Sequence, residues 1–270
     1  ELFNRKMIFN SQEFLIFFCV VIPTFFILPH KFRALLLLFS SYFFYAWWNP
    51  LYILLIIAST LVDFTAGKKI FASSQKRKKK YWLILSLTLN FGLLFLFKYA
   101  NYFGELFNIS RQGDLLINVL LPVGISFYTF QTVSYSIDIF RGKIEPERNL
   151  KTFALYVAFF PQLVAGPIER AATMIPQFKQ KVSFDTQRVS NGLILTLIGF
   201  FQKVVIADNL SVFVDVFYAN PNSYKGLSVL IIVIFFAFQI YNDFAGYTNI
   251  ARGIAQILGY ELSVNFKQPY

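Results

Sequence analysis

The sequence predicts an all-α, polytopic integral membrane protein, and three observations support this prediction. The 270 residues are 56% hydrophobic and 20% aromatic, and their mean hydropathy is +0.54. Only 14% of them are charged, whereas a soluble domain has roughly 25% charged residues. The basic residues lie in short segments between long apolar runs, as they do in membrane proteins. The chain therefore has too few charges to cover a surface that faces water.

The apolar runs indicate roughly eight membrane-embedded segments, since a helix that crosses a bilayer needs about 20 mainly apolar residues. They lie at residues 14–28, 34–48, 51–64, 82–99, 115–139, 153–168, 191–206 and 227–250. Several are short, so we expect some to be tilted, interfacial or re-entrant. No internal repeat is visible, which argues against a secondary transporter built from repeats.

The positive charges predict the orientation of these segments. If the turn at Lys31 is cytoplasmic, most lysines and arginines fall on the cytoplasmic side, provided that segment 153–168 enters the membrane and returns. The loop from Lys68 to Lys80 contains the densest basic run, which we interpret as a topology anchor rather than a site for anionic lipid. We therefore expect a multi-pass protein of the plasma (inner) membrane with this loop in the cytoplasm. Because membrane topology accounts for the basic residues, the net charge of +11 does not indicate a nucleic-acid partner, and none is expected.

Cysteine and histidine limit the possible chemistry. Cys19 is the only cysteine, which excludes an intramolecular disulfide, and no metal site is expected. His30 is the only histidine and lies in a basic turn, so we interpret it as incidental. Residues 1–6 precede Met7 and are expected to be an upstream or non-native extension. Residues 7–270 are expected to form the N-terminal part of a single membrane domain.

The informative residues are polar side chains inside apolar runs, because an unsatisfied polar group in hydrocarbon costs several kcal/mol. At about 100° per residue, one face of the last predicted helix contains Gln239, Asn242, Asp243, Gly246, Asn249 and Gly253. Such a stripe lines a hydrophilic tunnel or allows another helix to pack closely. Asp243 is the main candidate, since an intramembrane carboxylate is a candidate functional residue by default. Pairing with a neighbouring helix is an equally open interpretation.

A second polar stripe consists of Tyr128, Gln131, Tyr135 and Asp138, again at steps of three or four residues. It follows Pro122 and Gly124, which should break or kink the start of the helix. Hydrogen bonding between helices is favoured over contact with a substrate for this stripe.

Two further segments contain polar groups or helix breakers. The run FPQLVAGPIER (residues 160–170) contains Pro161, Gln162, Gly166 and Pro167 and cannot form an ordinary spanning helix. Irregular backbone at membrane depth occurs only where protein buries it or where it lines a cavity, so a re-entrant element that faces a site is expected. Lys203 lies in a later apolar run and either points inward or extends to an interface; we favour the interface.

Four of these segments, in this order, resemble the membrane-bound O-acyltransferase (MBOAT) family, in particular its alginate O-acetyltransferase branch. The matching stretches are LPVGISFYTFQ (121–131), FPQLVAGPI (160–168), KVVIADN (203–209) and QIYNDFAGY (239–247), followed by NFKQPY (265–270). The opening MIFNS (7–11) also looks like the start of that family. Each stretch alone is weak evidence, but the combination covers nearly the whole chain.

The resemblance implies a helical fold around a tunnel through the membrane. A thioester donor such as acetyl-CoA would enter from the cytoplasm, and acetyl would pass to hydroxyls of an exported polysaccharide, as in alginate biosynthesis. An extracytoplasmic acyltransferase partner would complete this transfer in some members. The candidate tunnel and substrate-binding residues are Gln239, Asn242, Asp243, Tyr128, Gln131, Asp138, Gln162, Gly166 and Pro167.

The resemblance also implies that the catalytic histidine lies in a Trp-His stretch beyond Tyr270. We therefore expect no catalytic residue and no bound cofactor in this chain, which alone should be inactive. Two other functions stay open: D-alanyl or acyl transfer to a cell-wall polymer such as teichoic acid, and transport or lipid flipping, which also uses polar stripes and broken helices. A Trp-His stretch after Tyr270 would indicate a transferase, and an inverted repeat of the first half a transporter.

The orientation is testable at the loop from Lys68 to Lys80. In a Cys19→Ser background, the Ser73→Cys variant should resist a membrane-impermeant thiol reagent in intact cells and react after lysis. Labelling of intact cells as fast as of lysed cells would reverse the predicted topology.

Overall fold

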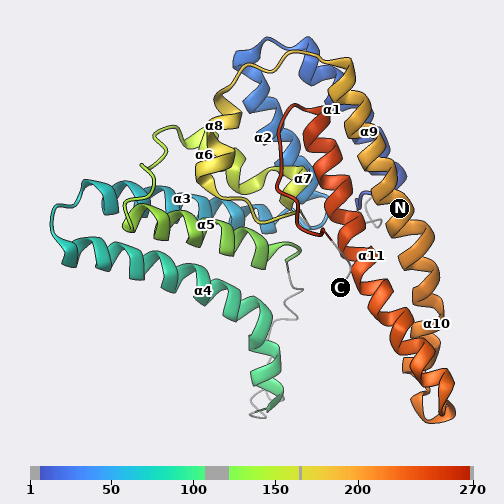
Figure 1. Cartoon of the computed structure of the whole chain (residues 1–270). Helices are drawn as coiled ribbons and strands as arrows, with labels where there is room; N and C mark the ends of the chain where they lie inside the picture. Colours follow the sequence, from blue (N-terminus) through green and yellow to red (C-terminus); the bar gives the residue numbers. More distant parts are fainter. Residues whose placement is uncertain (1–6, 107–121, 164–165, 268–270) are drawn as a thin grey trace. The chain divides into compact units, whose positions relative to one another are not determined.

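The computed structural model describes residues 7–106, 122–163 and 166–267, and nearly all of it is helical (Figure 1). No β-strand occurs within these ranges, so the predicted all-α fold class is confirmed. The chain divides into two compact units. Unit 1 comprises Glu1–His30, Ala165–Pro167 and Lys181–Tyr270, and unit 2 comprises Lys31–Val164 and Ile168–Gln180.

Unit 1 consists of one N-terminal helix and a long C-terminal helical pair. Its elements are α1 (Gln12–Ile27), α9 (Thr186–Phe200), the π-helix η2 (Phe201–Ala207), α10 (Asp208–Ala219), the 3₁₀ turn η3 (Pro221–Ser223) and α11 (Leu227–Ile257). α9, η2 and α10 form a continuous rod, and α11 packs along all three. Ser11 caps the start of α1, because its Oγ accepts a hydrogen bond from the Phe14 N–H at 3.1 Å.

Glycines set the distance between α9 and α11. A Cβ atom on Gly199 would lie 2.7 Å from the carbonyl oxygen of Gly246, and one on Gly192 would lie 2.8 Å from that of Gly253. Each helix spaces its two glycines seven residues apart, which returns them to the same face after two turns. Small residues at such an interface allow two backbones to touch. The glycines of the α11 stripe thus serve close helix packing.

Among its described residues, unit 2 contains a packed group of three helices and four further helices. Its elements are α2 (His30–Ala46), α3 (Tyr52–Ala72), α4 (Lys76–Leu106), α5 (Ile125–Phe140), α6 (Leu150–Ala158), α7 (Phe160–Leu163) and α8 (Ala171–Lys179). α3, α4 and α5 pack against one another, and α6 packs against α3 and α8. α5 begins directly after Gly124, whose φ is +76°, so the predicted break at this helix start is confirmed.

Three described helices are long and apolar enough to cross a membrane. They comprise Lys76–Tyr99 within α4, Thr186–Ala219 from α9 to α10, and Leu227–Ile257, which is α11. Only 17%, 17% and 6% of their most apolar windows are buried inside the protein. Apolar helices that the protein itself leaves uncovered are expected to face lipid, which supports a membrane protein. The predicted number of eight embedded segments stays a prediction.

One predicted boundary is wrong. The loop from Lys68 to Lys80 is reduced to residues 73–75, because Lys68 lies in α3 and the run from Lys76 belongs to α4. Lysine and arginine are good helix formers, so a basic run extends a helix as readily as it forms a loop. Segment 153–168 is interrupted, as expected for a run that cannot form an ordinary spanning helix: α6 ends at Ala158, and α7 follows as a single buried turn. Its re-entrant course stays a prediction. The first part of segment 115–139 lies outside the described residues.

The glycine contact between α9 and α11 is testable with a matched pair of substitutions in the full-length protein. Gly199→Ala should lower stability by about 1–3 kcal/mol, because the new Cβ overpacks a backbone contact. Gly92→Ala is the control, since no atom lies within 4 Å of its Cβ position in α4, and it should be neutral or stabilising by up to about 1 kcal/mol. Thermal unfolding in detergent measures both, and equal melting temperatures would contradict the proposed role of the glycines.

Candidate functional site

Lys203 forms the centre of the charged cluster of unit 1. Its Nζ lies 2.6 Å from Asp208 Oδ1 and 2.7 Å from Asp243 Oδ1. The Lys203 side chain is only 15% exposed, whereas the two aspartate side chains are 42% and 41% exposed. The Tyr247 ring lies 5.3 Å from the same ammonium, close enough for a cation–π contact. Lys203 therefore points inward, and the expectation that it extends to an interface is wrong: two carboxylates within reach hold it in place.

The π-helix η2 brings this lysine to α11. The Asn249 Nδ2 of α11 donates to the Gln202 Oε1 of η2 at 2.8 Å, and a Cβ on Gly246 would lie 2.9 Å from the Lys203 backbone nitrogen. A π-helix has a wider turn than an α-helix and often occurs at functional positions. The sequence offered no signal for it.

Some residues of the predicted polar stripe on α11 pack against or bond to neighbouring groups, and others have polar atoms without a partner among the described residues. Asn242 is buried, and its Nδ2 donates to the Phe238 carbonyl one turn earlier at 2.8 Å. The Asp243 Oδ1 that meets Lys203 is buried, although the side chain as a whole is 41% exposed. The Gln239 Oε1 is buried and accepts no hydrogen bond from any described residue. Pairing with a neighbouring helix thus accounts for one oxygen of Asp243, and Gln239 Oε1 is the group of the stripe that has no hydrogen-bond partner among the described residues.

The second predicted stripe forms hydrogen bonds between helices in unit 2. Gln131 Nε2 donates to the Tyr156 carbonyl at 2.6 Å, and Gln162 Nε2 donates to Gln131 Oε1 at 2.9 Å. The Tyr156 hydroxyl donates to the Glu169 carbonyl at 3.0 Å. The favoured interpretation, hydrogen bonding between helices, is confirmed for Gln131. The Gln162 Oε1 is buried without a hydrogen-bond partner among the described residues.

The remaining candidates are buried but take less part in this network. Tyr128 is 3% exposed, and Asp138 is 7% exposed and lies 4.0 Å from the Lys143 ammonium. Gly166 and Pro167 are buried in irregular backbone. The structure thus brings together Gln131 and Gln162 in unit 2, and Asn242 and Asp243 on α11 in unit 1.

Asp63 is a buried carboxylate, 0% exposed, that is not among the residues singled out from the sequence. Asp63 Oδ1 accepts hydrogen bonds from the Ser86 hydroxyl and, at 3.1 Å, from the Ser136 hydroxyl. Its Oδ2 accepts from Asn90 Nδ2 at 2.8 Å, and the Ser59 hydroxyl donates to Asn90 Oδ1 at 2.6 Å. No described lysine, arginine or histidine lies within 4.0 Å of this carboxylate. Neutral hydrogen-bond donors therefore satisfy it.

A sequence signal for this cluster did exist. Three helices each supply two polar residues four positions apart: Ser59 and Asp63 from α3, Ser86 and Asn90 from α4, and Thr132 and Ser136 from α5. Residues four apart share one helix face, so each pair marks the side that meets the other helices. Asp63, like Asp243, is a carboxylate inside an apolar run, so it is a candidate functional residue for the same reason.

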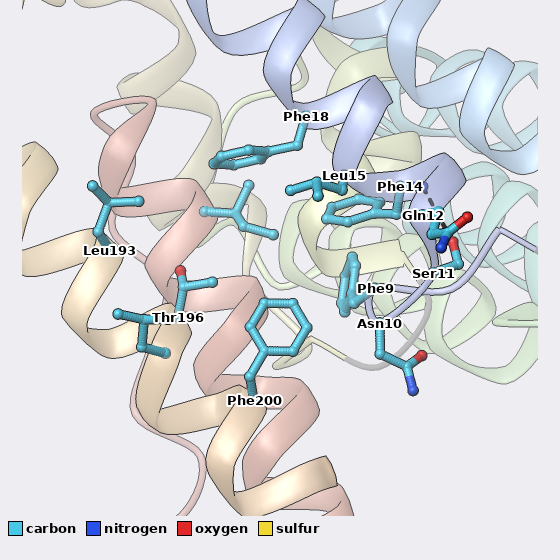
Figure 2. A pocket seen from close by; sticks show the side chains of 12 residues that line it. Phe9, Asn10, Ser11, Gln12, Phe14, Leu15, Phe18, Leu193, Thr196 and Phe200 are labelled. Atoms are coloured by element: carbon cyan, nitrogen blue, oxygen red, sulfur yellow. Dashed lines mark hydrogen bonds between the residues drawn. The ribbon is translucent and has the colours of Figure 1, made fainter.

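Unit 1 also contains an apolar pocket of about 360 Å³ (Figure 2). Phe9, Phe14 and Phe18 lie on one side of it, and Leu193 and Phe200 of α9 lie on the other. Asn10, Ser11 and Gln12 provide polar atoms at one end. Such a lining binds apolar groups by burial and offers no reactive side chain.

Relatives with assigned functions cover nearly the whole chain. It is 37% identical to the "Probable alginate O-acetylase AlgI" of Pseudomonas putida, over 98% of this chain and 56% of that protein. It is 33% identical to the peptidoglycan O-acetyltransferase of Helicobacter pylori, over 75% of this chain and 44% of that protein. The chain belongs to the membrane-bound O-acyltransferase family. The resemblance seen in the motifs is thereby confirmed.

A weaker similarity within the same comparison concerns the teichoic acid D-alanyltransferase of Bacillus subtilis, at 24% identity over 57% of this chain and 39% of that protein. No protein-family model matches this membrane-bound O-acyltransferase chain, so the assignment rests on the relatives. The chain spans about half the length of the curated relatives it matches.

Asp63 is testable by substitution in the full-length protein. Asp63→Leu should lower stability markedly, because each buried donor left without an acceptor costs about 1–3 kcal/mol. Asp63→Asn should cost less, since its oxygen still accepts from the two serines while only the Asn90 contact is lost. Asp215→Leu is the control, as Asp215 is exposed on α10. Thermal unfolding in detergent measures all three, and an unchanged melting temperature for Asp63→Leu would contradict the role of the cluster.

Proposed function

We propose that this chain forms part of an O-acyltransferase that transfers acetyl from a thioester donor, such as acetyl-CoA, to hydroxyls of an exported polysaccharide. The observation that supports this most is the 37% identity to an alginate O-acetylase over 98% of the chain. A peptidoglycan O-acetyltransferase is similar over 75% of the chain. Both names describe acetyl transfer to a carbohydrate polymer, so the proposed acceptor is a carbohydrate hydroxyl.

The proposed reaction needs a base and a dry site. The acceptor hydroxyl attacks the thioester carbonyl, its proton passes to a general base, and the thiol leaves. A site shielded from bulk water prevents hydrolysis of the thioester. We propose that the base is a histidine beyond Tyr270, as the family resemblance implies. Residues 1–270 alone would then lack general-base catalysis, which contributes roughly 10²–10⁴-fold to the rate.

The α11 stripe is proposed to line the tunnel in which donor and acceptor meet. The exposed part of Asp243 and the unpaired Gln239 Oε1 support this role, because helix packing within unit 1 leaves them available. Asn242 adjoins them on the same stripe. A lipid-facing carboxylate near mid-membrane would cost at least about 2.5–3.5 kcal/mol, so a polar surrounding for Asp243 is favoured.

Further tunnel or substrate-binding residues are proposed in each unit: Tyr128, Gln131, Asp138 and Gln162 in unit 2, and Gly166 and Pro167 in unit 1. Gln162 supports this proposal, since its Oε1 is buried without a partner among the described residues and its Nε2 donates to Gln131. The buried, irregular backbone at Gly166 and Pro167 is proposed to belong to a re-entrant element. Tyr128 and Asp138 complete the set as polar groups on the same helix as Gln131.

One alternative reaction has a specific observation in its favour. The similarity to a teichoic acid D-alanyltransferase supports D-alanyl transfer to a cell-wall polymer. The chemistry would be the same attack of a hydroxyl on a thioester, with a D-alanyl group in place of acetyl. The lower identity and coverage make acetyl transfer the first choice. In both cases we propose a plasma-membrane location, with the donor entering from the cytoplasm and an extracytoplasmic partner completing the transfer where one is needed.

The function is testable with the full-length protein in liposomes, with labelled acetyl-CoA on one side and alginate or peptidoglycan on the other. Full-length protein should transfer acetyl, and residues 1–270 alone should not. Asp243→Asn should lower the transfer rate at a normal protein level, whereas His30→Ala should leave it unchanged. Labelled D-alanyl thioester tests the alternative donor.

Two results would contradict this proposal. Transfer by residues 1–270 that His30→Ala abolishes would place the base in this chain. Full activity of both Asp243→Asn and Asp243→Leu would show that this residue lines no tunnel.

A further inference from the structure

Unit 1 contains a second pocket, polar and of about 320 Å³, near the end of α11. Its lining combines the C-terminal third of α11, one residue of α9 and the segment that follows α11. The lining residues are Leu195, Arg252, Gln256, Tyr260, Glu261, Leu262 and Val264. This volume is at the lower end of the range of small-molecule sites, about 300–1,000 Å³. The lining does not include the Lys203 cluster, and the pocket adjoins the polar stripe of α11 through Asn249, which accepts a hydrogen bond from Arg252.

Arg252 is the distinctive residue of this pocket, because its guanidinium has no acidic partner in the part of the chain that the structure describes. Nη1 donates to Asn249 Oδ1 at 3.2 Å, a neutral amide. Nε is buried and donates to no described residue, and no described carboxylate lies within 4.0 Å of the side chain. A guanidinium is always charged, and a partly desolvated charge without a counterion is costly. This arrangement calls for an anion.

The helix itself does not provide the missing negative charge. The dipole of α11 favours cations only within its last turn, and Arg252 lies five residues before the final residue, Ile257. Glu261 also lines the pocket, but its side chain is exposed and more than 4.0 Å from the guanidinium. Neither feature neutralises Arg252 at close range.

We propose that Arg252 and Gln256 bind a phosphate group in this pocket. A guanidinium presents parallel N–H groups that match two phosphate oxygens, and the terminal nitrogens of Arg252, which lines the pocket, are the proposed donors. The Gln256 amide, one turn further along α11, adds a neutral donor on the same side. The pocket is larger than a phosphate group needs, so the group that bears the phosphate has room as well.

The source of the phosphate follows from the proposed function, on which this step rests. Thioester donors such as acetyl-CoA or a phosphopantetheine carrier contain phosphate, whereas the acetyl group itself is neutral. The orientation predicted from loop charges places Arg252 on the cytoplasmic side, where such donors occur. The other possible source is the headgroup of a phospholipid, and the experiment below separates the two.

The test uses full-length protein in nanodiscs and compares coenzyme A with pantetheine, which shares its thiol arm but has no phosphate. Arg252→Gln should weaken coenzyme A binding by about 10- to 100-fold, the loss expected for a charge-assisted contact, and should leave pantetheine binding unchanged. Arg252→Lys keeps the positive charge but loses the paired N–H groups, so its affinity for coenzyme A should lie between those of the wild type and Arg252→Gln. Glu261→Gln should leave coenzyme A binding equal or tighter. Arg141→Gln, an exposed arginine of unit 2, is the matched control and should have no effect.

The outcomes separate the proposals. A lipid source predicts a different pattern: the melting temperature of the protein is higher in phosphatidylglycerol nanodiscs than in phosphatidylcholine nanodiscs. Arg252→Gln then removes this difference and leaves coenzyme A binding unchanged. If neither probe responds to Arg252→Gln, the phosphate site does not exist. Acetyl transfer from a phosphate-free thioester, S-acetyl-N-acetylcysteamine, tests the proposed function independently: it should persist in Arg252→Gln if the protein is an acetyltransferase.

Discussion

The backbone contact between α9 and α11 is the constraint on which unit 1 depends. Gly192 and Gly199 on one helix meet Gly253 and Gly246 on the other, and no Cβ fits between them. This close approach brings the Lys203 ammonium within 2.7 Å of Asp243. A side chain of ordinary size at either glycine pair would separate the helices and lengthen every polar contact between them. Packing therefore determines the electrostatics of this unit.

Unit 2 is held together by a different interaction. Its long helices meet through hydrogen bonds to a single carboxylate, Asp63, rather than through bare backbone. Ser86 and Asn90 satisfy Asp63 from one helix and Ser136 from another. In an apolar environment such bonds are directional and leave no donor without an acceptor. The cluster therefore fixes the rotation of three helices about their axes, which apolar packing alone does not.

Much of the fold followed from simple rules, since long apolar runs give helices and the Pro122–Gly124 pair starts α5 where expected. The α11 stripe was also visible, because polar residues three and four apart on an apolar helix share one face. The Asp63 cluster was visible in principle, although its members come from three separate helices. Only the tertiary structure shows that such pairs meet.

Other features had no local signal. The π-helix η2 is built from Phe201–Ala207, a sequence that reads as an ordinary helix, and it packs against α11. The inward direction of Lys203 depends on Asp243, which is 40 positions away in the sequence. The basic run after Lys76 reads equally well as loop or helix. The unpaired state of Arg252 depends on where every nearby carboxylate lies, which no sequence pattern gives.

The ion pair between Lys203 and Asp243 has a consequence for how the protein enters a bilayer. The rod from α9 to α10 contains the lysine, α11 contains the aspartate, and only residues 220–226 connect them. α11 inserted alone would bring the unmatched carboxylate of Asp243 into hydrocarbon, at about 2.5–3.5 kcal/mol near the centre, whereas the rod already pairs Lys203 with Asp208. Inserted together as a hairpin, the two elements give Asp243 a cationic partner and cover the glycine faces at once. Insertion of this part of the chain is therefore favoured as a single cooperative step.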